Sequence, residues 1–228
     1  AKFEAEGWQS FSSARTGDGP GRIYRVAPDG QIFQVTELPT APRSDEQQLY
    51  AVKRTSELSL KEVLKTIGVA QTELPLSVTA QLERKSNVET ESVNGRREYL
   101  EDRDLTDKSL VDALTGIKIR QDNTYFLIRE TLASNKLKFN ISRDWLAQLG
   151  VEADIKKVVE SKSDITWKDG SEVSLDATFD KPYRIWFKAE RLNVKDGSLG
   201  MGPGQPPQVS RTAGDFEVRL PEAISRQP

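Results

Sequence analysis

Apolar residues occupy every second position in several stretches of the chain. In the clearest case they alternate with polar residues over 74–82, and a more polar stretch of the same kind runs over 88–93 up to Asn94-Gly95. A period of two is typical of a strand with one buried face, and Asn-Gly favours a tight hairpin turn. We therefore predict strands at 74–82 and 88–93 and a turn at 94–95.

Further strands are predicted in the second half of the chain. Residues 125–141 begin with an apolar run and continue in alternation. A regular hairpin follows, because 165–167 and 173–179 alternate on either side of Lys168-Asp169-Gly170. The stretch 183–189 is apolar on parts of both faces, which indicates a central strand.

The N-terminal part of the chain contains another hairpin pattern. Apolar stretches at 22–26 and 31–35 flank Ala27-Pro28-Asp29-Gly30. Proline presets the backbone angle of a turn, and glycine accepts the positive φ that many turns require. The pattern predicts a hairpin over 22–35.

Three short segments have the spacing of amphipathic helices. Ser59 and Glu62 form a capping box ahead of apolar residues spaced three and four apart, which predicts a helix over about 59–67. Weaker patterns predict helices over 107–115 and 143–149. With the strands, they indicate an α+β fold in which short helices surround a twisted antiparallel sheet with long polar hairpins.

The composition changes near residue 195. Glycine and proline crowd the stretch after it, which is typical of a linker, and we place this linker at 195–214. Phe216, Val218 and Leu220 then alternate with charged residues in a tail over 215–228. We expect a body over 1–194 and a tail that packs back onto it.

The composition excludes several classes of function. The 228 residues include no histidine and no cysteine, which excludes Ser-His-Asp triads, thiolate nucleophiles and Cys/His zinc sites. The 33 basic and 35 acidic residues give a net charge of −2, without the basic excess that nucleic-acid binding needs. We expect no enzyme, no cofactor and no nucleic-acid partner.

The densest cluster of ionisable residues is acidic. Its oxygen ligands suit a divalent cation, but arginines at 96, 97 and 103 interleave with it, which favours a solvated loop. The cluster consists of Glu98, Glu101, Asp102, Asp104, Asp107 and Asp112.

The glycine-rich stretch 200–204 follows no buried strand and opens no helix, which favours a linker over a phosphate-binding loop. We expect no metal site and no catalytic residue.

The order of elements from Leu74 onward resembles the gasdermin pore-forming family, particularly its compact bacterial members. Residues 122–132 (DNTYFLIRETL) are similar to the central strand of the family, and 179–192 (FDKPYRIWFKAERL) are similar to its return strand. A polar hairpin region lies between them at about 151–180. The resemblance extends over 22–194 and implies a fold like that of a gasdermin N-terminal domain.

The resemblance also implies a mode of action. Such a body is held as an inactive cytoplasmic monomer by a C-terminal segment, and a protease removes that segment. The released body then oligomerises in the inner membrane as a β-barrel pore and causes cell death in antiphage defence. The implied partners are the activating protease, membrane lipid and further copies of the chain. Bacterial members commonly carry a lipidated cysteine near the N-terminus, and this sequence has none.

In that mechanism, strands 74–82 and 88–93, together with 151–167 and 173–179, extend into two membrane hairpins. The residues implied to face lipid are Leu76, Val78, Ala80, Leu82, Val173, Leu175, Ala177 and Phe179. The residues implied to face water are Ser77, Thr79, Gln81, Ser174, Asp176 and Thr178. The tail residues Phe216, Val218 and Leu220 would cover an apolar edge until the linker is cut.

A second reading of the same pattern is a soluble α+β binding or adaptor module without membrane activity. In this reading, the hairpins belong to an antiparallel sheet with one solvent-exposed face, and the tail forms the edge strand of that sheet. An enzyme with paired carboxylates is a third class. Dye release from liposomes after the linker is cut separates the first reading from the second.

Overall fold

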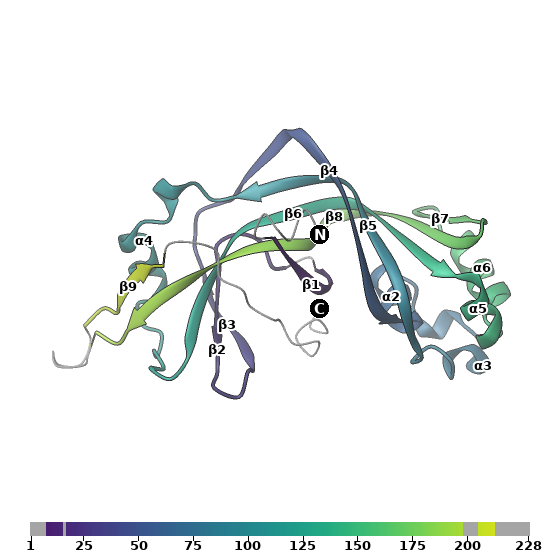
Figure 1. Cartoon of the computed structure of the whole chain (residues 1–228), viewed down its shortest axis with the longest axis horizontal. Helices are drawn as coiled ribbons and strands as arrows, with labels where there is room; N and C mark the ends of the chain where they lie inside the picture. Colours follow the sequence, from purple (N-terminus) through teal and green to yellow (C-terminus); the bar gives the residue numbers. More distant parts are fainter. Residues whose placement is uncertain (1–7, 16, 198–204, 213–228) are drawn as a thin grey trace. The chain divides into compact units, whose positions relative to one another are not determined.

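The computed structural model describes residues 8–15, 17–197 and 205–212 (Figure 1). In this part of the chain, nine strands form one sheet, and the order along its main path is β1-β8-β6-β2-β3. β4 pairs with β5, β5 also pairs with β6, and β7 and β9 both pair with β8. The strands are β1 Gln9–Arg15, β2 Arg22–Val26, β3 Ile32–Glu37, β4 Arg43–Ser59, β5 Lys85–Tyr99, β6 Thr124–Ser142, β7 Ile165–Lys168, β8 Glu172–Lys195 and β9 Gln208–Arg211.

Short helices connect these strands. The α-helices are α2 Leu60–Thr66, α3 Leu76–Thr79, α4 Asp107–Leu114, α5 Arg143–Leu149 and α6 Glu152–Glu160, and the 3-10 helices are η1 Gln71–Glu73 and η2 Asp102–Asp104. Every pairing with a defined register, including β2 with β3, β7 with β8 and β8 with β9, is antiparallel. The fold class is therefore α+β with an antiparallel sheet, as the sequence predicts.

The chain divides into two compact units. Unit 1 comprises 1–48, 96–133 and 184–228, and unit 2 comprises 49–95 and 134–183. Because each of β4, β5, β6 and β8 contributes residues to both units, the long strands are shared between them. In β5 the division follows Gly95, next to Asn94, whose φ of 54° is unusual for a residue other than glycine.

Unit 1 has two apolar clusters that lie on the two faces of β6. Tyr125 and Leu127 belong to one cluster, together with residues of α4 and β9, and Phe126 and Ile128 belong to the other. Since neighbouring side chains of a strand point to opposite faces, both faces of this part of β6 are buried. The apolar run at its start predicts this arrangement.

Unit 2 contains helices that are fixed by local capping. The Ser59 hydroxyl accepts a hydrogen bond from the amide of Glu62 (3.1 Å), and the Glu62 carboxylate accepts one from the amide of Ser59 (2.7 Å). At α5, the Ser142 hydroxyl accepts from the amide of Trp145 (3.3 Å), and Gly150 closes the helix at φ 67°. The predicted helices at 59–67 and 143–149 are confirmed as α2 and α5, and the one predicted at 107–115 is confirmed as α4 of unit 1.

Several predicted strands are also confirmed. The hairpin over 22–35 is β2 with β3, and 125–141 lies within β6. The hairpin around 168–170 is β7 with β8, in which Ile165 lies opposite Ala177. The stretch 183–189 lies within β8.

The strand predicted over 74–82 is wrong, because the segment follows η1 and contains the helix α3. Its apolar residues satisfy two periods at once: they alternate, but Leu74, Val78 and Leu82 are also four residues apart. These three side chains are buried, so the helical spacing is the one that the fold uses. Pro75 favours this outcome, since it lacks an amide hydrogen for a sheet and fits the start of a helix.

Two further predictions differ from the structure. The turn at Asn94-Gly95 is wrong, because β5 continues through both residues to Tyr99. The strand over 151–167 is wrong in its first part, where 152–160 forms α6. Ile155 and Val159, one helical turn apart, are its buried residues, and the polar residues between them lie on the other faces of the helix.

Candidate functional site

The C-terminal strand β9 is a four-residue segment that docks on the end of β8. The pairing is antiparallel, with Leu192 opposite Arg211 and Val194 opposite Val209. Val209 is buried in the apolar cluster that also contains Leu110 and Leu114 of α4. β9 therefore contributes a side chain to the core of unit 1, although it follows the stretch 198–204 outside the described residues.

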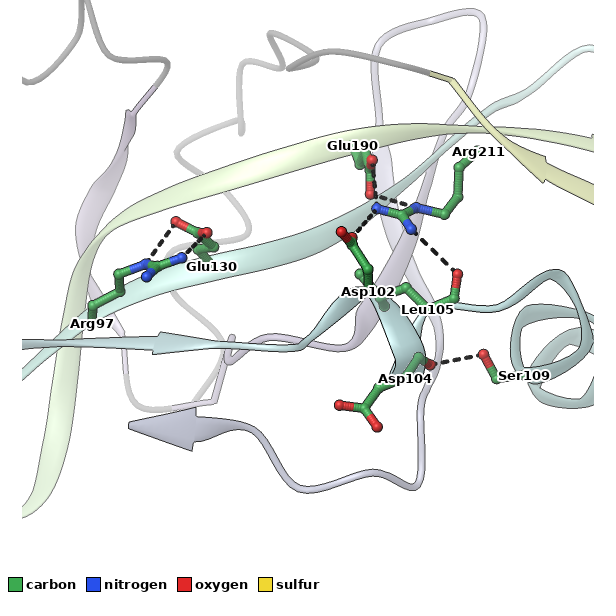
Figure 2. A network of polar contacts seen from close by, with 8 residues as sticks. All are labelled: Arg97, Asp102, Asp104, Leu105, Ser109, Glu130, Glu190 and Arg211. Atoms are coloured by element: carbon green, nitrogen blue, oxygen red, sulfur yellow. Dashed lines mark hydrogen bonds and ion pairs between the residues drawn. The ribbon is translucent and has the colours of Figure 1, made fainter. Parts of the chain in front are cut away.

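Arg211 holds β9 through a set of charged and polar contacts (Figure 2). Its Nε and Nη2 donate to the two carboxylate oxygens of Glu190, at 3.0 and 2.9 Å. Nη2 also donates to Asp102 (3.2 Å), and Nη1 donates to the carbonyl of Leu105 (3.4 Å). Burial lowers the pKa of Arg211, but its hydrogen bonds to Glu190 and Asp102 outweigh burial and raise that pKa.

Among the contacts of Arg211, the one with Glu190 contributes most to the docking of β9, because the Glu190 side chain is only 6% exposed. A buried carboxylate without a cation is strongly destabilising, and two parallel N–H···O bonds are the strongest geometry in which arginine binds one. The contact to Asp102 adds less, since that side chain is 92% exposed. In the docked state, Arg211 is therefore the cation that compensates for the burial of Glu190.

The segment that receives Arg211 is itself fastened to α4. The Ser109 hydroxyl donates to the carbonyl of Asp104 at 2.8 Å (Figure 2). The Thr106 hydroxyl accepts from the amide of Ser109 at 3.1 Å. α4 also packs against β9. The receiving side of the β9 site is therefore built from η2, α4 and β8.

A second charged network ties together three of the four long strands, β5, β6 and β8, within unit 1. Arg97 of β5 donates to the Glu130 carboxylate of β6, with Nε at 3.2 Å (Figure 2). Arg184 of β8 donates to both oxygens of Glu98 at 2.6 and 2.9 Å, and the Thr131 hydroxyl donates to the same carboxylate at 2.7 Å. β5, β6 and β8 are thus cross-linked within unit 1, near the positions at which each strand passes from one unit to the other.

The acidic cluster is explained by such pairs. Glu98 pairs with Arg184, and Asp112 pairs with Lys108. Glu101 pairs with Arg43 (2.8 Å) and Arg103 (2.6 Å). Among the described residues, no group of three or more acidic side chains is placed to hold a metal ion.

The predicted lipid-facing residues of β8 lie on one face of the strand. Val173, Leu175 and Ala177 are buried, and Phe179 packs its ring against Tyr183 with centroids 4.4 Å apart. On the opposite face, Ser174 and Asp176 are half-buried and Thr178 is exposed. The structure therefore brings the members of this set together.

The predicted set from 74–82 is not on one strand face. Leu76 is 88% exposed and Ala80 is exposed, whereas Val78 and Leu82 are buried. Of the set implied to face water, Ser77 is exposed, and Thr79 and Gln81 are half-buried. These residues belong to α3 and the turn after it.

The tail residues Phe216, Val218 and Leu220 lie outside the described residues. The linker expected over 195–214 contains β9, which the sequence reading missed together with Arg211. The available signal was a single apolar residue, Val209, between polar neighbours. The partner Glu190 lies 21 positions away, so no local pattern connects it to Arg211.

No helix among the described residues has the length and apolar character needed to cross a membrane.

Comparisons with known proteins agree with this architecture. A family model described as the Bacterial Gasdermin Family matches residues 12–200. Among solved structures, a bacterial gasdermin from Bradyrhizobium tropiciagri is similar, with a TM-score of 0.50 and 12% identity over 95% of this chain and 90% of that chain. Among curated proteins, no match is found. Since the family model spans most of the chain and a solved member shares the fold, this chain belongs to the bacterial gasdermin family.

Proposed function

We propose that this protein is an autoinhibited pore-former, in which the C-terminal segment that contains β9 holds the body inactive until a protease cuts it off. Membership of the bacterial gasdermin family supports a pore-forming function of the gasdermin type. The observation that carries the proposal is the docking of β9 by Arg211 on the buried Glu190. This contact gives a short C-terminal segment a strong hold on a central strand.

The contact also suggests how removal of the C-terminal segment affects the structure of unit 2. Once β9 leaves, the ion pair of Arg211 with Glu190 and the burial of Val209 are both lost, and the free energy of unfolding of the resting state falls. β8 is shared between the two units, with residues 184–195 in unit 1 and 172–183 in unit 2. A change at the β9 site therefore acts on the strand that carries Val173, Leu175 and Ala177.

The lengths of the unit 2 strand segments favour these segments as the membrane hairpins. The parts of β4, β5, β6 and β8 in unit 2 span 49–59, 85–95, 134–142 and 172–183. Each has about 9–12 residues, close to the roughly 9–11 that a membrane strand requires. These four segments would form two hairpins, and the charged network of unit 1 would mark the end of the inserted part.

In the inserted state, Val173, Leu175, Ala177 and Phe179 would face lipid, and the alternating Ser174, Asp176 and Thr178 would face water. Participation of Leu76, Val78, Ala80 and Leu82 on a lipid-facing strand would require η1 and α3 to unwind.

A single subunit cannot insert alone, because every backbone amide in lipid needs a partner. We therefore include oligomerisation into a barrel, with membrane lipid and further copies of this chain as partners after cleavage. We further propose that the uncut protein is an inactive cytoplasmic monomer. After cleavage it would form a pore in the inner membrane and cause cell death in antiphage defence. The activating protease is its remaining partner.

The proposal is tested by placing the recognition sequence of a site-specific protease in 198–204 and measuring dye release from liposomes of phosphatidylethanolamine and phosphatidylglycerol. Cut protein should release the dye, whereas uncut protein, and wild type treated with the same protease, should not. Absence of release from the cut protein would contradict the proposal and favour a soluble binding module.

A further inference from the structure

The turn of the β7–β8 hairpin carries a carboxylate that receives donors from three other elements. Asp169 accepts hydrogen bonds from Arg143 at the start of α5, from Lys156 Nζ of α6 (2.9 Å) and from the indole Nε1 of Trp167 in β7 (3.0 Å). Arg143 also lies 3.7 Å from Glu152 of α6. All of these residues belong to unit 2.

The contacts at Asp169 join the tip of the hairpin to the helices that pack beneath it. α6 packs on β7, and α5 packs on α6. The buried residues of the hairpin include Ile165, Val173 and Leu175, and those of α6 are Ile155 and Val159. The packing of α6 on β7 fixes the position of the hairpin, and the contacts of Asp169 fix its tip.

The polar face of the hairpin has different surroundings. It borders a cleft of about 550 Å³, lined by Thr166, Asp176 and Thr178 of the hairpin and by Lys136 and Lys138 of β6. The cleft leaves space for the hairpin on its polar face. On the side of α6, by contrast, the tip cannot move away without breaking the contacts of Asp169.

We infer that Asp169 is a latch that fastens the β7–β8 hairpin to α5 and α6, and that its opening is a step separate from the release of β9. The inference rests on the proposed function, in which residues 172–183 of β8 insert into the membrane and must therefore separate from β7 and α6. The β9 site restrains β8 within unit 1, and the latch restrains the other end of the hairpin within unit 2.

The charge of the latch persists over the pH range of a cell. Hydrogen bonds from Lys156, Trp167 and Arg143 depress the pKa of Asp169 to about 2. The carboxylate therefore stays ionised, and refolding of α5 and α6 opens the latch rather than protonation. Because the pairs are exposed, each adds little, and the latch slows the departure of the hairpin by no more than the stabilisation that the pairs add together.

The test uses the full chain with the engineered protease site and the substitution Asp169→Asn. Asp164→Asn is the matched control, because Asp164 lies next to the same hairpin and is exposed, and its substitution leaves the contacts of Arg143 and Lys156 intact. Two quantities are measured: the amide exchange rates of 164–178 in uncut protein, and the rate of dye release after cutting.

We expect Asp169→Asn to accelerate amide exchange in the hairpin and to accelerate dye release by roughly threefold to tenfold, the range for a small network of exposed pairs. The control variant should match wild type in both. Exchange equal to the control would overturn the latch, and faster exchange with unchanged release would overturn its role as a separate step.

Failure of the proposed function gives a different pattern. In that case no cut variant releases dye, wild type included, and the exchange measurement still decides whether Asp169 fastens the hairpin. Unchanged exchange in that case would overturn the latch as well. Circular dichroism of both variants verifies that the fold is intact.

Discussion

Replacement of Arg211 by methionine removes the guanidinium that pairs with Glu190 but keeps most of the aliphatic length of the side chain. The variant leaves a carboxylate that is 6% exposed without its bidentate partner. We expect β9 to detach from β8 much more often, because the docked state alone contains the unpaired buried charge. Arg211→Met should therefore weaken the docking of β9 and should do so without cleavage of the chain.

The expected size of the effect follows from the burial of the pair. Removing one partner of a fully buried ion pair costs about 3–5 kcal/mol. The Arg211 side chain is 22% exposed, so water partly solvates the site, and a cost of about 2–3 kcal/mol is the more suitable figure. Since 1.4 kcal/mol is a factor of ten, the undocked fraction should rise about 30- to 150-fold.

Hydrogen exchange followed by mass spectrometry measures this effect directly. Peptides that cover 205–212 and 190–197 should exchange faster in the variant by a similar factor. Arg96→Met is the matched control, because Arg96 pairs with Glu46 in a contact where both side chains are more than half exposed, and its exchange should equal that of wild type. The double variant Arg211→Met with Glu190→Met should recover most of the protection.

Two results would refute the reasoning about Glu190. Exchange of 205–212 within twofold of wild type in Arg211→Met would show that the ion pair contributes little to docking. Failure of the double variant to recover protection would show that the unpaired carboxylate is not the cause of the loss. A leakage assay on the uncut variant adds the functional consequence, and it should show dye release above that of uncut wild type.

The other predictions concern unit 2. The hydroxyl of Thr90 in β5 is buried and has no hydrogen-bond partner among the residues that the structure describes. Thr90→Val should therefore stabilise the resting protein by about 1 kcal/mol and raise Tm by roughly 2–4 °C. Thr178→Val, at an exposed position, is the control, and a fall in the Tm of Thr90→Val would contradict the reasoning. Because the pKa of Asp169 is depressed from 3.8 to about 2, its contribution to stability is fully present above pH 3.8 and is lost as the pH falls toward 2. The NMR resonance of the Trp167 indole N–H should therefore stay constant from pH 7 to about pH 4, and a titration midpoint near pH 4 would show that the carboxylate is not held as described.

Local patterns predict several elements of this fold correctly, because the residues that determine them are neighbours. The capping box of Ser59 and Glu62 is complete within four positions, and α2 begins where it indicates. The turn at 168–170 likewise lies between two regular alternations. In contrast, 74–82 satisfies both a strand and a helix pattern, and only the packing of Val78 and Leu82 in unit 2 selects the helix.

The candidate sites depend on contacts that no sequence window contains. Arg211 and Glu190 are 21 positions apart, and Arg143 and Asp169 are 26 positions apart. Charged residues are frequent in this chain, so their partners could not be chosen from spacing alone. The family, by comparison, is recognisable from the sequence, because the segments that carry the resemblance, 122–132 and 179–192, lie largely within single long strands, β6 and β8.

The central claim is that departure of β9, rather than the cut itself, releases the activity. The chain contains no cysteine, so the pair Asn193→Cys and Ser210→Cys introduces one disulfide at positions that lie opposite each other in the β8–β9 pairing. Directly opposite residues of antiparallel strands have Cα atoms roughly 4.5–5.5 Å apart, within the range that a disulfide spans. The same variant carries the engineered protease site in 198–204.

The decisive measurement is dye release by this cut protein before and after reduction. β9 remains tethered to β8 in the oxidised protein, so we predict no release until a reductant is added, and then release at the rate of the cut chain without the two cysteines. Equal release from the oxidised and reduced cut proteins would contradict the account, because the body would then be active with β9 still attached.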